Sequence, residues 1–249
     1  MNPFFFGDTG RALYGVHHPP RGSTPRSAGV VLCYPFAQEY MRAHRAFRQL
    51  SLLLSGEGFH VLRFDYTGTG DSVGEPSDMS VAGWNEDLAV AIEELMDTAA
   101  VESVWIVGLR LGAAVALEGA QRAEVRGVVL WDPIISGEEQ LANGMTSAIP
   151  GGSPVFTVGG IPISSSLRDE MKATDLMRTP VRPQLKTLLA VSSDTDGFRA
   201  LRDRLSRDGA SVTYTCVPSD GRWSLFDNWG SALIPQELIR AIVDYLKRM

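Results

Sequence analysis

Two five-residue segments bounded by glycines are the places where this sequence could hold a reactive side chain on a sharp turn. Gly70-Asp-Ser-Val-Gly74 has the G-x-S-x-G spacing that exposes a nucleophilic serine. Gly108-Leu-Arg-Leu-Gly112 has the same spacing, with Arg110 at its centre. The chain holds 25 glycines, so about two or three such spacings are expected by chance. The flanking elements must therefore decide between them.

The flanking residues favour the second segment as the turn that carries function. An apolar run over 104–107 precedes it, and a helix of small residues over 113–120 follows, which is the strand-turn-helix order that such a turn needs. Glu75 and Pro76 follow the first segment, and no helical pattern starts there. We therefore predict that Ser72 is a loop hydroxyl bonded to nearby backbone.

Arg110 cannot act as a nucleophile or general base, because a guanidinium stays protonated in proteins. A cation at a helix N-terminus is disfavoured by about 0.3–1 kcal/mol, so something should offset it. One possibility is an internal carboxylate, from Glu39, Asp132, Asp194 or Asp220. The other is a ligand carboxylate or phosphate gripped by the guanidinium. The sequence leaves both open.

The set of side chains needed for nucleophilic catalysis is incomplete. All four histidines precede the second segment: His17, His18, His44 and His60. No histidine occurs in the loop after the last predicted strand, residues 217–224. Acids do follow two predicted strands, Asp132 after one and Asp194 and Asp196 after another, although Asp196 could equally cap the next helix. Cys33 ends an apolar run and is expected in the core.

The elements that must position these residues alternate along the chain. Short apolar runs typical of strands cover 29–33, 59–64, 104–107, 127–131, 185–191 and 211–217, and helical spacing lies between them. This alternation predicts an α/β fold, with a mostly parallel sheet and helices on both faces. Residues 3–6 and 11–16 predict an antiparallel hairpin at its edge.

One stretch breaks the alternation. Residues 134–183 are rich in Gly, Pro and Ser, with weak helical pattern only at 138–145 and 167–177. We expect a single domain over 1–249 with a small lid or binding insertion there.

Composition excludes several classes of protein. The 249 residues carry a net charge of −6, which argues against nucleic-acid binding. Two separated cysteines and no cluster with metal-ligand spacing give no expectation of a metal or cofactor. No apolar stretch reaches about 18 residues and no signal peptide is visible, so we expect no membrane span and a cytoplasmic protein. The oligomeric state is left open.

Three segments together resemble the α/β-hydrolase superfamily: the loop 32–39, the loop 64–72 and the turn 107–113. Within this superfamily, the sequence is most similar to the serine-aminopeptidase-like and exosortase A system-associated hydrolases. Three segments carry this similarity: Leu130-Trp-Asp-Pro133, the Pro-Phe-x-x-Glu loop at 35–39 and Gly-Leu-Arg-Leu-Gly at 108–112. The family's reaction uses a serine at the turn, an acid, and a histidine after the last strand. Here Arg110 stands at the serine's position, and the histidine is missing.

The resemblance implies a pocket between Arg110, residues 35–39 and the insertion. Phe36 or Ala37 would donate a backbone N–H to a bound carbonyl together with Leu111, and Glu39 and Trp223 would line the pocket.

Two hypotheses follow for function. The first is a protein whose catalytic triad is degenerate. It would bind a small molecule, which could be an anion, or serve as an accessory protein in bacterial biosynthesis such as that of exopolysaccharide. The second is an active hydrolase or lyase on an ester, thioester or other carbonyl compound, with Arg110 as anion anchor and Asp132 or Asp194 as base.

Overall fold

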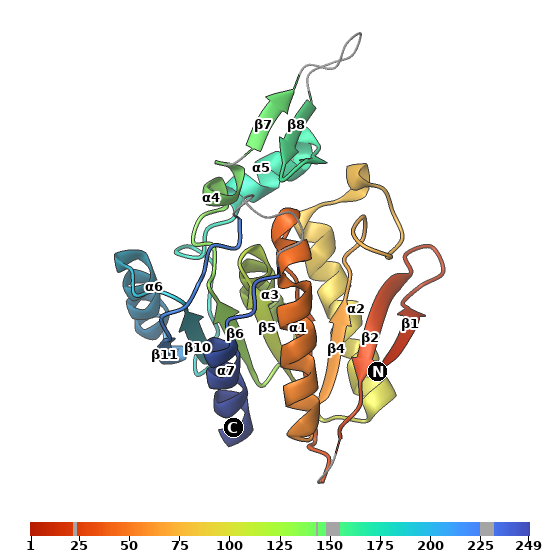
Figure 1. The fold of residues 1–249 in the computed structure, drawn as a ribbon, viewed down its shortest axis with the longest axis vertical. Coiled ribbons are helices and arrows are strands. Elements are labelled where there is room, and N and C mark those ends of the chain that lie inside the picture. Colours follow the sequence, from red (N-terminus) through yellow and green to blue (C-terminus); the bar gives the residue numbers. More distant parts are fainter. Residues whose placement is uncertain (22–23, 143, 148–154, 225–231) are drawn as a thin grey trace.

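An eight-stranded sheet forms the centre of the molecule (Figure 1). The computed structural model describes residues 1–21, 24–142, 144–147, 155–224 and 232–249. In spatial order the strands are β1 (Asn2–Phe6), β2 (Leu13–His18), β4 (His60–Phe64), β3 (Ala28–Cys33), β5 (Ser103–Leu109), β6 (Gly127–Trp131), β10 (Lys186–Val191) and β11 (Ser211–Cys216). β2 is antiparallel to β1 and β4, and every other pair is parallel. The predicted sheet and edge hairpin are confirmed.

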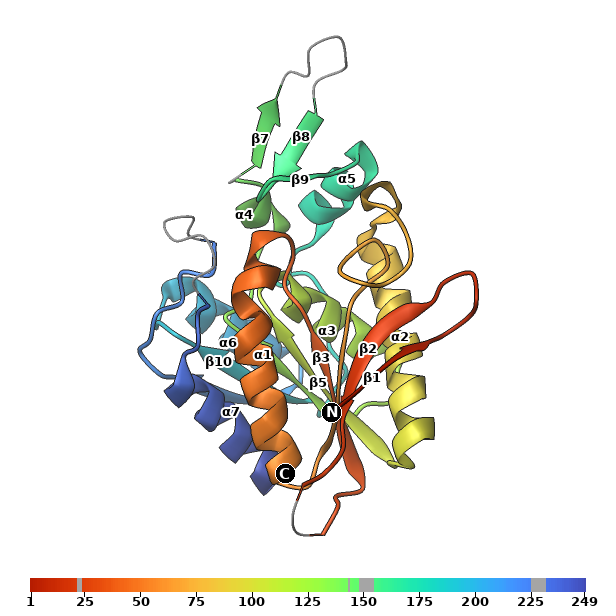
Figure 2. The same ribbon diagram turned by 45° about the vertical axis from the view of Figure 1, so that its right-hand side comes forward.

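Helices cover both faces of this sheet, as the alternation predicts (Figures 1 and 2). α1 (Gln38–Gly56) and α7 (Gln236–Arg248) pack together on one face, and α2 (Val81–Ala99) and α3 (Leu111–Arg122) pack together on the other. α6 (Asp196–Arg207) packs beside β11, and a single turn of 3-10 helix, η1 (Pro76–Asp78), precedes α2. Residues of β3, β5 and β6 are buried almost throughout, because both faces of these central strands are covered.

The described helices and strands of the insertion, residues 134–183, stand beyond the carboxyl ends of the central strands (Figure 2). Its last residues, Arg182 and Pro183, lie at the opposite ends of the strands, next to Val125 and Gly209. The described part of the insertion has five elements. It contains α4 (Gly137–Leu141), a small antiparallel sheet of β7 (Gly144–Ser147), β8 (Val155–Val158) and β9 (Ile161–Pro162), and α5 (Ser165–Ala173). Both predicted helices are shorter than their patterns. α5 ends early because Asp175 forms a β-bridge with Ser136, which requires extended backbone. The small sheet was not predicted.

Candidate functional site

The turn between β5 and α3 is tight enough to exclude any side chain at its flanking positions. A Cβ on Gly108 would lie 2.1 Å from the carbonyl oxygen of Gly112, and a Cβ on Gly112 would lie 2.3 Å from that of Cys33. Arg110, at the centre, has φ 54°, a left-handed value that is rare outside glycine. The predicted functional turn is therefore present, with Arg110 directly preceding the first turn of α3.

Three oxygen atoms hold the Arg110 guanidinium. Nε donates to Glu39 Oε1 at 3.1 Å and Nη2 to Glu139 Oε1 at 3.0 Å, while Nη1 donates to the carbonyl of Asp132 at 3.3 Å. The side chain of Arg110 is 14% exposed and that of Glu39 only 3%. Glu139 belongs to α4 and is half-exposed. The internal carboxylate is thus Glu39, and Arg110 also ties the insertion to the sheet.

Burial and charge oppose each other in this ion pair. Burial raises the pKa of Glu39, and the attraction of Arg110 partly opposes that rise. The pKa of Arg110 is raised despite its burial, because Glu39 and Glu139 both stabilise the cation. Glu39 Oε2 has no hydrogen-bond partner among the described residues. The pair therefore depends on Arg110 to keep a buried carboxylate ionised.

Asp132 is buried, and both of its carboxylate oxygens accept hydrogen bonds. Oδ1 accepts from the backbone N–H of Ser192 at 2.6 Å, and Oδ2 accepts from Trp223 Nε1 at 2.9 Å. Burial raises the pKa of Asp132, and these donors oppose the rise. Trp223 lies in the loop after the last strand of the main sheet, where the resemblance expects a histidine. An indole N–H donates only, so this side chain holds the acid but cannot accept a proton.

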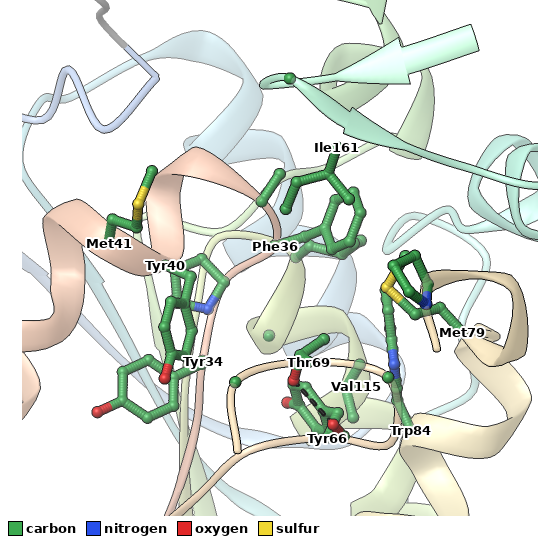
Figure 3. Close-up of a pocket in the computed structure, with 18 of the residues that line it drawn as sticks. Tyr34, Phe36, Tyr40, Met41, Tyr66, Thr69, Met79, Trp84, Val115 and Ile161 are labelled. Carbon is green, nitrogen blue, oxygen red and sulfur yellow. Dashed lines mark hydrogen bonds between the residues drawn. The ribbon is translucent and has the colours of Figure 1, made fainter. Parts of the chain in front are cut away.

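An apolar cavity of about 310 Å³ lies beside the turn (Figure 3). Aromatic rings enclose it, with Tyr34 and Tyr40 on one side and Trp84 on the other, while Ile161 of the insertion lies above. Its other described lining residues are Pro35, Phe36, Ala37, Met41, Tyr66, Gly68, Thr69, Gly70, Pro76, Met79, Leu111, Gly112, Val115, Gly160 and Pro162. Neither Arg110 nor any histidine is among the described residues that line this cavity.

Arg110 lines a different cleft, a polar one of about 260 Å³ that also includes Asp132, Glu139 and Ser192. The expected pocket is therefore divided in two. Residues 35–37 and the insertion line the apolar cavity, whereas Arg110 lines the polar cleft. Glu39 and Trp223, which were also expected to line the pocket, are not among the described residues that line the apolar cavity.

The predicted carbonyl-binding groups lie at the cavity. Phe36, Ala37 and Leu111 all line it. Within the described part of the chain, no acceptor pairs with their backbone N–H groups. Ala37 has φ 57°, close to the value of Arg110, and each of the two residues directly precedes a helix. A carbonyl oxygen of a bound molecule could accept from these N–H groups.

The other predicted residues lie elsewhere. Asp194 is on the surface, where the Tyr214 hydroxyl and Arg199 hold it and lower its pKa. Asp196 is also exposed, and Thr195 rather than Asp196 caps α6. The Asp220 carboxylate pairs with Arg222.

Ser72 has a structural role, as predicted. Its hydroxyl donates to the carbonyl of Asp65 and accepts from the N–H of Tyr14. Cys33 is fully buried, and its burial raises the pKa of the thiol to about 12.

Two residues of the site, one at the Arg110 ion pair and one at the apolar cavity, were not predicted from the sequence. Glu139 lies in the insertion, and only its place in the first turn of a short helix hinted at a role. Trp84 lies on α2, and the helical spacing of that segment gives no sign that its indole borders a cavity.

Residues 31–244 match the family model described as Alpha/beta hydrolase family. The chain belongs to the alpha/beta hydrolase family. The family and fold class predicted from the sequence are confirmed, whereas the narrower subgroup stays a prediction.

Curated relatives of this alpha/beta hydrolase match it only in part. Alpha/beta hydrolase domain-containing protein aho-3 of Caenorhabditis elegans is 29% identical over 120 residues, covering 46% of this chain and 33% of that protein. Lysophosphatidylserine lipase ABHD12 of Xenopus tropicalis is 38% identical over 74 residues, covering 30% of this chain and 18% of that protein. The matched stretches thus span about a third or less of these relatives.

The fold has close counterparts among solved structures. Est1E from Butyrivibrio proteoclasticus with bound ferulic acid superposes with a TM-score of 0.67 at 11% identity, over 98% of this chain and 96% of that one. This similarity shows the shared fold. In the described parts of this chain, no helix is long and apolar enough to cross a membrane, and no group of three or more His, Cys, Asp or Glu residues could hold a metal ion.

Proposed function

We propose that this member of the family binds a small carbonyl compound with an apolar acyl or aryl body and does not hydrolyse it. The observation that carries the proposal is the apolar cavity beside Phe36 and Leu111, next to a turn whose centre is Arg110. A cavity of about 310 Å³ is at the lower end of the range for small-molecule sites.

The side chains argue against acyl transfer. Arg110 offers no nucleophile, and Glu39 and Glu139 already neutralise its charge. Asp132 is hydrogen-bonded on both oxygens, and Asp194 is on the surface. Among the described residues, the anion anchor and the two acids named for the alternative enzyme all have partners already, which supports binding over catalysis.

The assignment to an accessory role in bacterial biosynthesis, in the cytoplasm, is the remaining part of the proposal. It is supported by the sequence resemblance to exosortase A system-associated proteins. The name of the lysophosphatidylserine lipase relative adds acyl lipids as a chemical class for the ligand.

Binding can be tested with p-nitrophenyl octanoate, because a nitrophenyl group quenches tryptophan fluorescence and Trp84 borders the cavity. We expect saturable quenching without release of p-nitrophenol. Val115→Phe fills the cavity from α3 and should abolish the quenching. Val73→Phe adds the same ring at an exposed position and should leave it unchanged. Equal quenching in the wild type and Val115→Phe would contradict the proposed site.

Catalysis is tested separately by labelling with a fluorophosphonate and by ester turnover. We expect neither. Labelling that disappears in Ser72→Ala would identify an unorthodox serine hydrolase and overturn the proposal. Turnover that survives in Ser72→Ala but disappears in Asp132→Asn would favour the alternative enzyme.

A further inference from the structure

A second cleft lies behind the tyrosine wall of the apolar cavity. Tyr34 and Tyr40 line both spaces, and Figure 3 shows their hydroxyls pointing away from the other residues of the apolar cavity. The second cleft has a volume of about 280 Å³, and charged side chains of α1, of β4 and of the loop after β4 line it. Its charged or titratable side chains, apart from the tyrosines, are those of His44, Arg48, Arg63, Asp65 and Asp71, and Met1 with its terminal amino group also lines it.

Arg63 is a buried cation, and the described groups that hold its side chain are neutral. It is 5% exposed. Nε donates to His18 Nε2 at 3.1 Å, and Nη1 donates to the Tyr34 hydroxyl at 2.8 Å. Among the described residues, no carboxylate forms an ion pair with Arg63, and Nη2 has no acceptor. Burying a charge costs free energy unless an opposite charge is nearby. An anion bound in the cleft would offset that cost for Arg63.

A second cation faces the same cleft. Arg48 is exposed on α1 and lines the cleft. The described part of the chain contains no ion pair or hydrogen bond to its side chain. Two guanidinium groups on one small cleft match the planar and bidentate recognition of carboxylate and phosphate oxygens.

The carboxylates of the cleft do not serve as these partners. Asp65 Oδ1 accepts from the Tyr40 hydroxyl at 2.8 Å, and Oδ2 accepts from the N–H of Asp71 at 3.1 Å. Asp71 itself is exposed and forms no ion pair with a described residue. His18 accepts from Arg63 through Nε2, and burial, with Arg63 beside it, lowers its pKa to about 4, so it adds no positive charge at neutral pH.

We propose that this cleft is a binding site for a small oxyanion, a carboxylate or phosphate group held between Arg63 and Arg48. The anion accepts from Arg63 Nη2 at the buried end and from Arg48 at the exposed end. The Tyr34 hydroxyl, which accepts from Arg63, has a proton left to donate to the same group. The site is independent of the apolar cavity, because the rings of Tyr34 and Tyr40 stand between the two.

The test is calorimetric titration of the full chain with inorganic phosphate and, separately, with acetate, at ionic strength held constant with sodium chloride. We expect saturable binding of one anion per chain with a Kd in the millimolar range. The stronger of the two titrations identifies phosphate or carboxylate as the preferred group.

Two surface variants of α1 locate the site. Arg48→Gln should weaken binding about tenfold, as expected for loss of a charge-assisted hydrogen bond. Arg45→Gln, an exposed arginine of the same helix that is not among the lining residues of the cleft, should leave the Kd unchanged. Arg63→Lys keeps the charge but loses the forked donors, and should also weaken binding.

The proposal is overturned if neither anion binds saturably, or if Arg45→Gln and Arg48→Gln weaken binding equally. Thermal melting of each variant without anion shows whether it is folded. Because Arg48 is exposed, its variant remains interpretable even if Arg63→Lys does not fold. Failure of this test leaves the apolar cavity and its quenching assay untouched.

Discussion

Replacing Arg110 with methionine should destabilise the fold by about 3–5 kcal/mol at pH 7. The variant leaves Glu39 as a buried carboxylate without its cation, and removing one partner of a buried pair costs about this much. The half-exposed Glu139 adds only about 0–1 kcal/mol, and the bond to the Asp132 carbonyl about 0.5–1.5 kcal/mol. These terms overlap, so the buried pair sets the magnitude. Methionine has the same backbone restriction as arginine at φ 54°, so backbone strain cancels.

The loss should depend on pH in a defined direction. Burial already raises the pKa of Glu39, and without Arg110 it rises further. A glutamate with a raised pKa in the folded state binds its proton more tightly there, so its contribution to stability is present at low pH. That contribution disappears as pH rises through the folded-state pKa. The deficit of Arg110→Met should therefore be small near pH 4 and complete at neutral pH.

The assay is urea unfolding of wild type and variant from pH 4 to 8, followed by tryptophan fluorescence. Adding Glu39→Gln to Arg110→Met removes the buried charge and should recover more than half of the loss. Arg240→Met is the matched control, since Arg240 is 63% exposed and pairs with an exposed glutamate, and it should cost under about 1 kcal/mol. If Arg110→Met costs no more than this control at every pH, the ion pair does not hold the turn, and Arg110 is free to bind a ligand.

Two further substitutions test the hydrogen bond to Asp132 and the buried histidine beside Arg63. Trp223→Phe removes the donor to Asp132 Oδ2, leaving a buried acceptor that should cost about 1–3 kcal/mol in urea unfolding; an unchanged midpoint would refute this role. His18→Gln removes a histidine whose pKa burial and Arg63 lower to about 4. Because the unfolded chain binds that proton more readily, wild-type stability falls between pH 6.5 and 4, and the variant should lose about 3 kcal/mol less over that range. Parallel pH dependences for the two proteins would contradict it.

The sheet and the turn were predictable because their signals are local. β5 is an unbroken apolar run, and α3 begins with small residues that let the helix approach the sheet closely. Gly108 and Gly112 are required where backbone atoms would clash with any Cβ. These patterns lie within about fifteen residues of chain, so the position of Arg110 followed from sequence.

The partners of Arg110 were less predictable, because they come from distant elements. Glu39 could be named as one of four acids, but choosing it required the relative placement of α1 and α3. Glu139 depends on how the glycine- and proline-rich insertion folds, and β7, β8 and β9 carry no strong alternating pattern. The bond of Trp223 to Asp132 joins residues 91 positions apart. Such contacts follow from tertiary packing and leave no periodic trace in the sequence.

The backbone of the site is strained at two positions, which bears on the proposed binding of a carbonyl compound. Ala37 and Arg110 both hold left-handed values of φ, and each such residue costs on the order of 1–3 kcal/mol. Glu39 and Glu139 hold the Arg110 side chain, but no side-chain contact of that kind holds Ala37. What the two strained turns share is that they border one apolar cavity with N–H groups that no described residue accepts. A protein that needed only the fold could relax either turn with glycine. We infer that the strain is retained because these N–H groups orient a bound carbonyl.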